Sequence, residues 1–172
     1  MTPEIHPAKI EDWAAIMHVH QQAFAGRIKE ARLVELLHVR NKAVISLVAV
    51  HDGVIVGHIL FSPVRLNPPH PSFHALGLAP IAVLPCHQRQ GIGSQLIREG
   101  LRLCKQNDFV AVVALGDPGY YSRFGFTRAR DKGLDNEYHA NNDFMVLELQ
   151  PNALAGIRGK VKYAPEFAEA GC

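Results

Sequence analysis

The segment Gln88-Arg89-Gln90-Gly91-Ile92-Gly93 lies between an apolar, strand-like run and an amphipathic helix. The run before it, 75–84, is apolar on both alternating faces, and the stretch after it, 91–107, repeats apolar residues at helical spacing. A glycine turn that opens a helix exposes backbone N–H groups with no intrahelical partner, and the helix dipole places partial positive charge there. Because glycine lets an anion approach the backbone closely, the segment predicts a turn that binds a phosphate-bearing cofactor.

The rest of the chain predicts further strands and helices around this strand–turn–helix unit. Periodicity distinguishes the two types, and Asp52-Gly53 predicts a hairpin turn. The predicted strands are 4–9, 44–50, 54–61, 75–84, 109–115, 144–149 and 161–163, and the predicted helices are 11–24, 29–40, 91–107 and a short one within 117–124. The Pro-rich stretch 63–71 is expected to be a loop.

This order of elements predicts an α+β fold with α/β/α layers. Consecutive strands in the first half favour antiparallel pairing, and the strand–helix–strand unit 75–115 favours one parallel crossover. The sheet is therefore expected to be mixed, mostly antiparallel, and covered by helices on both faces. Pro80 cannot donate to a ladder, so the pairing of its strand must be broken on one side.

Composition bounds the class of protein. The 172 residues, 48% hydrophobic and 20% charged, are expected to form one domain over 1–172. The net charge of +2, without a Lys/Arg block, gives no sign of nucleic-acid binding, and no apolar run approaches the roughly 20 residues that span a bilayer. Three unevenly spaced cysteines, Cys86, Cys104 and Cys172, do not make a disulfide framework. Without a visible signal peptide, these features predict a soluble, cytoplasmic protein with reduced thiols and no membrane contact.

Two separate motifs resemble those of the GCN5-related N-acetyltransferase (GNAT) family. The strand that ends in Ile81-Ala82-Val83, followed by Gln88-x-x-Gly91-x-Gly93 and a helix, is similar to the family's motif A. The segment Tyr120-Tyr121-Ser122-Arg123-Phe124-Gly125-Phe126 is similar to the family's aromatic element after the fifth strand. The chain is similar in detail to a YhbS-like bacterial subgroup through 56–63, 115–118, 137–138 and 144–149. The resemblance implies the GNAT fold, whose sheet is splayed between the fourth and fifth strands.

The resemblance also implies acetyl-CoA as the co-substrate and no metal ion. Backbone groups of Ile81 and Val83 would pair with the amides of the pantetheine arm, and Tyr120 and Phe124 would wall that arm. Arg89 would add a charge-assisted contact to the pyrophosphate, which the glycine turn surrounds. The cofactor-binding residues that the resemblance implies are Ile81, Ala82, Val83, Gln88, Arg89, Gln90, Gly91, Ile92, Gly93, Ser94, Tyr120 and Phe124.

By the same resemblance, the predicted reaction is direct attack of an acceptor amine on the thioester, without an acyl-enzyme. Tyr121 occupies the position of the group that protonates the CoA thiolate, and a tyrosine pKa of about 10 would suit a thiolate of comparable basicity. The backbone N–H of Val83 is the candidate donor to the developing oxyanion. The general base stays open, with Glu30 ranked first because it lies in the early helical region that lines acceptor pockets in the family. The other candidates are Glu35, Glu137, His58 and Asp117.

Several alternatives compete with this mechanism. His58 lies among apolar strand residues, which favours a structural histidine over a base. Cys86 and His87 are adjacent at the cofactor turn, but neighbouring loop residues usually point apart, so a nucleophilic pair is not expected. The sequence has no His-Glu-x-x-His spacing, Gly-x-Gly-x-x-Gly fingerprint or Gly-Lys-Ser/Thr loop, so it predicts no metal, dinucleotide or Walker-type nucleotide site.

The predicted function is acetyl transfer to a small amine or to an exposed amine of a protein or peptide. The principal rival is a GNAT-fold sensor or scaffold that binds acyl-CoA without turnover, and retention of Tyr121 with the full glycine turn favours catalysis. A lesser rival is transfer of a longer acyl group. The segments 63–74 and 131–142 are expected to set the acceptor, and the resemblance also allows a homodimer in which the late strand and the 151–172 tail take part.

Overall fold

The computed structural model describes residues 2–172, which divide into two compact units. The first unit contains the residues up to Ser62, Ala79–Leu101 and Pro165–Cys172, and the second contains Pro63–Leu78 and Arg102–Ala164. Strand β5 (Ala75–Val83) contributes one half to each unit. That the whole of 1–172 is a single domain stays a prediction.

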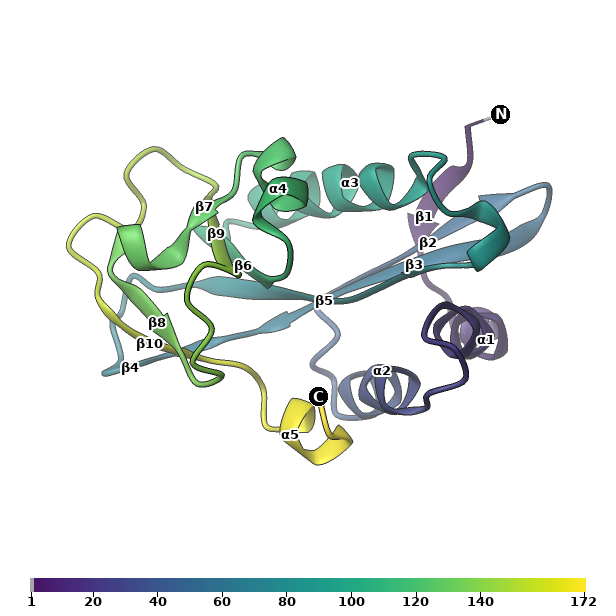
Figure 1. Cartoon of the computed structure of the whole chain (residues 1–172), viewed down its shortest axis with the longest axis horizontal. Coiled ribbons are helices and arrows are strands. Elements are labelled where there is room, and N and C mark those ends of the chain that lie inside the picture. The colour runs from purple at the N-terminus through teal and green to yellow at the C-terminus, as the bar shows by residue number, and fades with distance from the viewer. Residues whose placement is uncertain (1) are drawn as a thin grey trace. The chain divides into compact units, whose positions relative to one another are not determined.

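Antiparallel pairing builds most of the sheet in the first unit (Figure 1). Strand β1 (Glu4–Pro7) pairs with β2 (Ile45–His51), β2 pairs with β3 (Val54–Pro63), and the second half of β5 follows β3 in the hydrogen-bonded order. The hairpin between β2 and β3 turns at Asp52 and Gly53. Their positive φ angles of 49° and 75° fit the two-residue turn that Asp-Gly predicts.

Helices cover both faces of this sheet. Helices α1 (Trp13–Ala23) and α2 (Lys29–Val39) lie on one face, and α3 (Ile92–Gln106) lies on the opposite face (Figure 1). Helix α3 approaches β3 closely because Gly100 has no side chain, and a Cβ there would lie 2.3 Å from Cε1 of Phe61. The shorter helical segments of the unit are η1 (Ile10–Asp12), η2 (Pro85–His87) and α5 (Glu166–Ala170).

In the second unit, the first half of β5 pairs in parallel with β6 (Ala111–Leu115). Strands β6 and β7 (Thr127–Arg128) both pair antiparallel with β9 (Phe144–Glu148). The parallel pairing joins Ala75–Gly77 to Ala111–Val113 and ends there, so β5 and β6 part beyond these residues. The predicted fourth and fifth strands, 75–84 and 109–115, correspond to β5 and β6, so this is the splay that was predicted between them.

A smaller sheet of the second unit has the strand order β4-β10-β8. Its strands are β4 (Arg65–Asn67), β8 (Leu134–Asn136) and β10 (Gly159–Lys162). Short helical segments separate the strands of the unit, namely α4 (Pro118–Tyr121), η3 (Ser122–Phe124) and η4 (Ala129–Lys132).

The predicted fold class is confirmed by the mixed sheet, its parallel crossover and the helices on both faces. The expectation of a loop over 63–71 is wrong at β4, because these residues pair with β10 near the C-terminus. Strands β7 and β8 and helix α5 were not predicted, since each is short and owes its conformation to distant partners.

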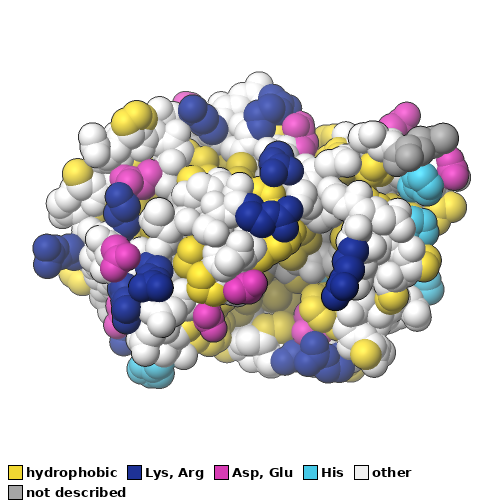
Figure 2. All heavy atoms as spheres, turned by 45° about the horizontal axis from the view of Figure 1, so that its top comes forward, with side chains coloured by type: hydrophobic (Ala, Val, Ile, Leu, Met, Phe, Trp, Pro, Cys, Tyr) yellow, Lys and Arg dark blue, Asp and Glu magenta, His cyan; other side chains and the backbone are white. Residues whose placement is uncertain are grey.

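Charged side chains of both signs are interspersed on the face shown in Figure 2. A mixed face of this kind differs from the one-sign surface that is typical of nucleic-acid binding. Within residues 2–172, no helix has both the length and the apolar character needed to cross a membrane.

Candidate active site

The turn before α3 contains two residues in the left-handed backbone region, Arg89 with a φ of 60° and Gly91 with a φ of 83°. Glycine adopts this conformation without strain, and a Cβ added to Gly91 would meet no atom of residues 2–172 within 4 Å. The side-chain Nε2 of Gln88 donates to the carbonyl oxygen of Val83 at 2.9 Å and so ties the turn back to the end of β5. The hydrogen bond from Gln88 holds the turn against the end of β5, and the space beside Gly91 is open to a ligand.

Helix α3 begins at Ile92, directly after this turn. The first N–H groups of a helix have no acceptor inside the helix, and the helix dipole adds partial positive charge. The hydrogen bond from Gln95 N to Gly91 O, at 3.0 Å, closes the first helical turn. Together the turn and the start of α3 form a site that can bind an anion such as a pyrophosphate.

The second half of β5 presents an open edge beside this turn. Leu84 N–H donates to Val56 O on β3 at 2.8 Å. Because N–H groups alternate along a strand, the N–H of Ala82 also points toward β3, and those of Ile81 and Val83 point toward the opposite edge. Ile81 and Val83 are half-buried and Ala82 is buried. Ile81 and Val83, whose backbone groups the family resemblance predicts to pair with the pantetheine amides, therefore present their N–H groups on an edge where pairing with β6 has already ended.

In the second unit, aromatic rings cluster at α4 and η3. The ring centroids of Tyr120 and Tyr121 are 5.3 Å apart, those of Tyr120 and Phe124 are 5.3 Å apart, and those of Tyr121 and Phe126 are 5.4 Å apart. The Arg123 guanidinium lies 5.2 Å from the centre of the Tyr120 ring and 5.7 Å from that of Phe124. These contacts hold the aromatic residues in fixed orientations.

Tyr121 is the buried member of the candidate catalytic residues in this unit. Its ring packs against the backbone at Gly116, where a Cβ would lie 2.5 Å from Cε2 of the ring. Burial, with a smaller contribution from Tyr120, raises the pKa of Tyr121 to about 12. The pKa of about 10 assumed from the sequence is therefore too low, because the residues that surround this ring could not be predicted.

Glu30, the first-ranked general base, lies in the first turn of α2. The residue is 9% exposed. Its Oε1 lies 3.6 Å from Nη2 of Arg27, while Oε2 is buried and has no hydrogen-bond partner among residues 2–172. A buried carboxylate oxygen with a free acceptor site can receive a proton from a ligand.

The other candidate carboxylates are engaged or exposed. Glu137 Oε1 accepts the backbone N–H of Tyr163 at 2.8 Å. Asp117 caps α4 by accepting the backbone N–H of Gly119 at 3.2 Å. Glu35 is exposed on α2. The structure thus separates Glu30 from its rivals by burial and by the free acceptor site.

His58 belongs to a hydrogen-bonded chain inside the first unit. Its Nδ1 lies 2.8 Å from Nε2 of His20, and its Nε2 lies 2.8 Å from Oγ of Ser46. The Ser46 Oγ in turn lies 3.2 Å from Nε2 of His38. His58 and His20 are fully buried, and burial lowers the pKa of His20 to about 4 and the pKa of His58 well below its usual value. These contacts agree with the structural role favoured for His58, and the chain around it had no signal in the sequence beyond the individual histidines.

Cys86 and His87 do not point apart as expected. The Cys86 Sγ lies 3.1 Å from Nδ1 of His87, and both residues belong to the 3₁₀ turn η2. The His87 ring also contacts the ring of His51, with centroids 5.6 Å apart. No cluster of His, Cys, Asp and Glu able to hold a metal ion occurs in the part of the chain that the structure describes, residues 2–172.

Sequence comparisons extend across most of the chain. Residues 4–129 match the family model described as an acetyltransferase (GNAT) domain. The chain is 37% identical over 140 residues to the N-acetyltransferase YhbS of Escherichia coli K12, which covers 80% of this chain and 83% of YhbS. It is 36% identical over 160 residues to the N-acetyltransferase YjhQ of the same strain, which covers 88% of each chain.

Solved structures agree with the sequence comparisons. The crystal structure of E. coli YhbS in complex with CoA superposes with a TM-score of 0.91 at 33% identity and covers 98% of this chain and 93% of YhbS. The structure of a GNAT family acetyltransferase from Brucella melitensis in complex with acetyl-CoA superposes with a TM-score of 0.80 at 34% identity, covering 96% and 97% of the two chains.

Proposed function

Because the chain belongs to the GNAT family of N-acetyltransferases, we propose that it transfers the acetyl group of acetyl-CoA to a primary amine of a small molecule or of an exposed protein or peptide site. The observation that carries this proposal is the glycine turn at the start of α3 next to the open edge of β5. The relatives from E. coli and B. melitensis were solved with CoA and acetyl-CoA, which supports the same co-substrate here.

Acetyl-CoA would bind in the first unit through the backbone. The turn around Gly91 and the first N–H groups of α3 would hold the pyrophosphate, and the open space beside Gly91 fits a bulky anion. Backbone groups of Ile81 and Val83 would pair with the pantetheine arm as a neighbouring strand does, and the N–H of Val83 would be kept for the reacting thioester carbonyl. The proposed contacts of Tyr120 and Phe124 with that arm rest on the family resemblance.

Glu30 is the proposed general base. At neutral pH an alkyl amine is protonated, and it must lose that proton before its nitrogen can attack the thioester carbon. The Oε2 of Glu30 would accept the proton, directly or through water. As the C–N bond forms and the C–S bond breaks, the N–H of Val83 would donate to the developing oxyanion, the thiolate would leave, and the nitrogen of the new amide would lose its second proton to solvent.

Tyr121 is the proposed donor to the leaving sulfur. A hydrogen bond to a charged sulfur lowers the energy of the departing thiolate without a covalent step on the protein. This mechanism needs no acyl-enzyme, so it assigns no nucleophilic role to the Cys86–His87 pair.

A thiol-release assay with acetyl-CoA and a panel of primary amines tests the proposal. With an accepted amine, Glu30→Gln should lower kcat/KM by about 100-fold or more, because the amide cannot take the proton. Glu35→Gln is the matched control, since Glu35 lies on the same helix but is exposed, and it should change kcat/KM by less than about threefold. Equal losses in the two variants would exclude Glu30 as the base. Binding of CoA without turnover on any amine would favour a sensor over an enzyme.

A further inference from the structure

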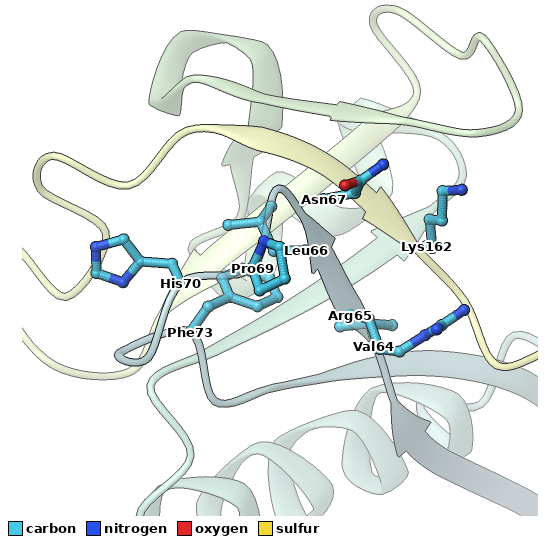
Figure 3. A pocket seen from close by; sticks show the side chains of 8 residues that line it. All are labelled: Val64, Arg65, Leu66, Asn67, Pro69, His70, Phe73 and Lys162. Atoms are coloured by element: carbon cyan, nitrogen blue, oxygen red, sulfur yellow. The ribbon is translucent and has the colours of Figure 1, made fainter.

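A pocket of about 490 Å³ opens on the second unit beside the small sheet (Figure 3). Strand β4 supplies Arg65, Leu66 and Asn67, and β10 supplies Lys162. The remaining lining residues come from the adjoining chain, namely Val64, Pro69, His70 and Phe73. None of these residues belongs to the glycine turn, the aromatic cluster or the candidate bases.

Two cations face each other across the strands of this pocket. Arg65 and Lys162 are register partners in the antiparallel β4–β10 pair. Side chains directly opposite one another start from Cβ atoms only about 5 Å apart, and like charges at that separation destabilise the pair. Figure 3 shows both side chains on the same side of the pocket, with His70 on the other.

Neither cation is neutralised by a carboxylate of residues 2–172. Within residues 2–172, no Asp or Glu oxygen lies within 4 Å of Arg65 or Lys162. Glu137 accepts a hydrogen bond from the backbone N–H of Tyr163, the residue after Lys162. Lys160 on the same strand is not among the residues that line the pocket, and its register partner on β8 is Asp135. Repulsion between two adjacent cations without a compensating charge is an unfavourable feature of the kind that proteins retain at functional sites.

The rest of the pocket is largely apolar. Val64 and Leu66 are 7% and 5% exposed, so they form a packed base, and Pro69 and Phe73 lie beside them (Figure 3). The Asn67 side chain at the end of β4 adds an amide that can donate hydrogen bonds. The volume is within the range of roughly 300–1,000 Å³ that is usual for small-molecule sites.

We propose that this pocket binds small molecules that carry a carboxylate or a phosphate on an apolar body. The planar guanidinium of Arg65 matches either anion in a bidentate arrangement, and Lys162 adds a point charge. The anion would remove the repulsion between the two cations, and its apolar body would cover Pro69 and Phe73. The inference rests on the second unit alone and does not depend on acetyl transfer.

NMR titration of the full chain, in the presence of excess CoA, tests this site. The probes are phenyl phosphate and phenylacetate, which separate the two anions, and 2-phenylethanol as the neutral analogue. The expected result is saturable shifts of the backbone amides over 65–73 and 160–162 with one or both anions. Arg65→Gln and Lys162→Gln should each weaken binding by about tenfold or more.

Lys160→Gln is the matched control, because this lysine lies on the same strand opposite Asp135, and it should change the affinity by less than about threefold. Unchanged amide shifts outside the pocket will show that each variant is folded. The proposal is overturned if neither anion gives saturable shifts at these amides, if 2-phenylethanol binds as tightly as the anions, or if Lys160→Gln weakens binding as much as the other two changes.

Discussion

At the scale of single residues, burial determines what Tyr121 can do. With a pKa raised to about 12 by its apolar surroundings, the hydroxyl stays protonated at neutral pH. Full proton transfer to a thiolate with a pKa of about 8.5 would be uphill by about 5 kcal/mol. Donation of a hydrogen bond has no such cost. Tyr121 is therefore better suited to stabilise the departing sulfur than to give up its proton.

Replacing the Tyr121 hydroxyl should affect turnover more than binding. We expect Tyr121→Phe to lower kcat by about 10- to 100-fold, the range of one hydrogen bond to a charged group, with the dissociation constant of CoA changed by less than about twofold. Tyr120→Phe is the control, because it removes the neighbouring hydroxyl and keeps the ring. Steady-state kinetics and calorimetry measure the two quantities, and an unchanged kcat in Tyr121→Phe would limit this residue to a packing role.

At the scale of elements, the histidine chain joins α1, α2, β2 and β3 through hydrogen bonds. The buried Nδ1 of His20 has no partner within residues 2–172, which favours the tautomer with its proton on Nε2. His20 then donates to His58, His58 donates to Ser46, and Ser46 donates to His38. With the protons placed in this way, each hydrogen bond of the chain has one donor and one acceptor. The three histidines of the chain are therefore neutral in the folded state.

This chain should make folding stability depend on pH. The pKa of His20 is about 4 in the folded protein and 6.5 when exposed, so between these values the unfolded state binds more protons. The free energy of unfolding should therefore fall as the pH drops, by about 2 kcal/mol from His20 alone between about pH 7 and about pH 5. Urea unfolding at the two pH values measures the loss. His20→Gln should show a smaller loss over the same interval, and an equal loss would contradict the assignment.

Most elements were predictable because their signals are local. The Asp52-Gly53 hairpin, the apolar stripe of α3 and the aromatic motif at α4 each depend on neighbours within a few residues. Strand β4 was missed because its partner, β10, is almost a hundred residues away and prolines follow it directly. The approach of Cys86 to His87 was missed because it depends on the shape of one short turn.

At the scale of the whole molecule, the end of the chain returns to α2. Glu166 on α5 is 2% exposed and accepts hydrogen bonds from Lys42 at 2.7 and 3.1 Å and from Arg40 at 3.2 Å. Burial would raise its pKa, but these cations outweigh that effect and the pKa is lowered. Glu169 pairs with the same Arg40 at 2.6 and 2.9 Å from an exposed position.

These two glutamates form a matched pair for a stability measurement. Glu166→Gln should lower the free energy of unfolding by about 2 kcal/mol, because it removes the charge that compensates the cations in a buried contact. Glu169→Gln should leave stability nearly unchanged, since exposed ion pairs contribute little. Denaturant unfolding compares them at one pH, and equal effects would show that burial does not control the strength of this contact.

The candidate site was only partly predictable. The glycine turn and the tyrosine lie in continuous motifs, so the sequence predicts them by residue number. The base could not be chosen, because several carboxylates differ only in their tertiary contacts. Glu137 and Asp117 bind backbone N–H groups, whereas Oε2 of Glu30 stays unpaired among residues 2–172. The pocket lined by Arg65 and Lys162 could not be predicted from the sequence either, because these two residues become neighbours only when β4 pairs with β10.

Pyrophosphate binding at the Gly91 turn is the step on which the proposed function depends most. Calorimetric titration of acetyl-CoA into the wild-type protein, Gly91→Ala and Gly91→Asp tests it most directly. Both variants strain the backbone at a φ of 83°, but only Asp adds a negative charge in the open space beside the turn. We expect binding to the wild type, a moderate loss of affinity in Gly91→Ala and a further loss of about tenfold or more in Gly91→Asp. Equal affinities in the three proteins, or no binding to the wild type, would contradict it.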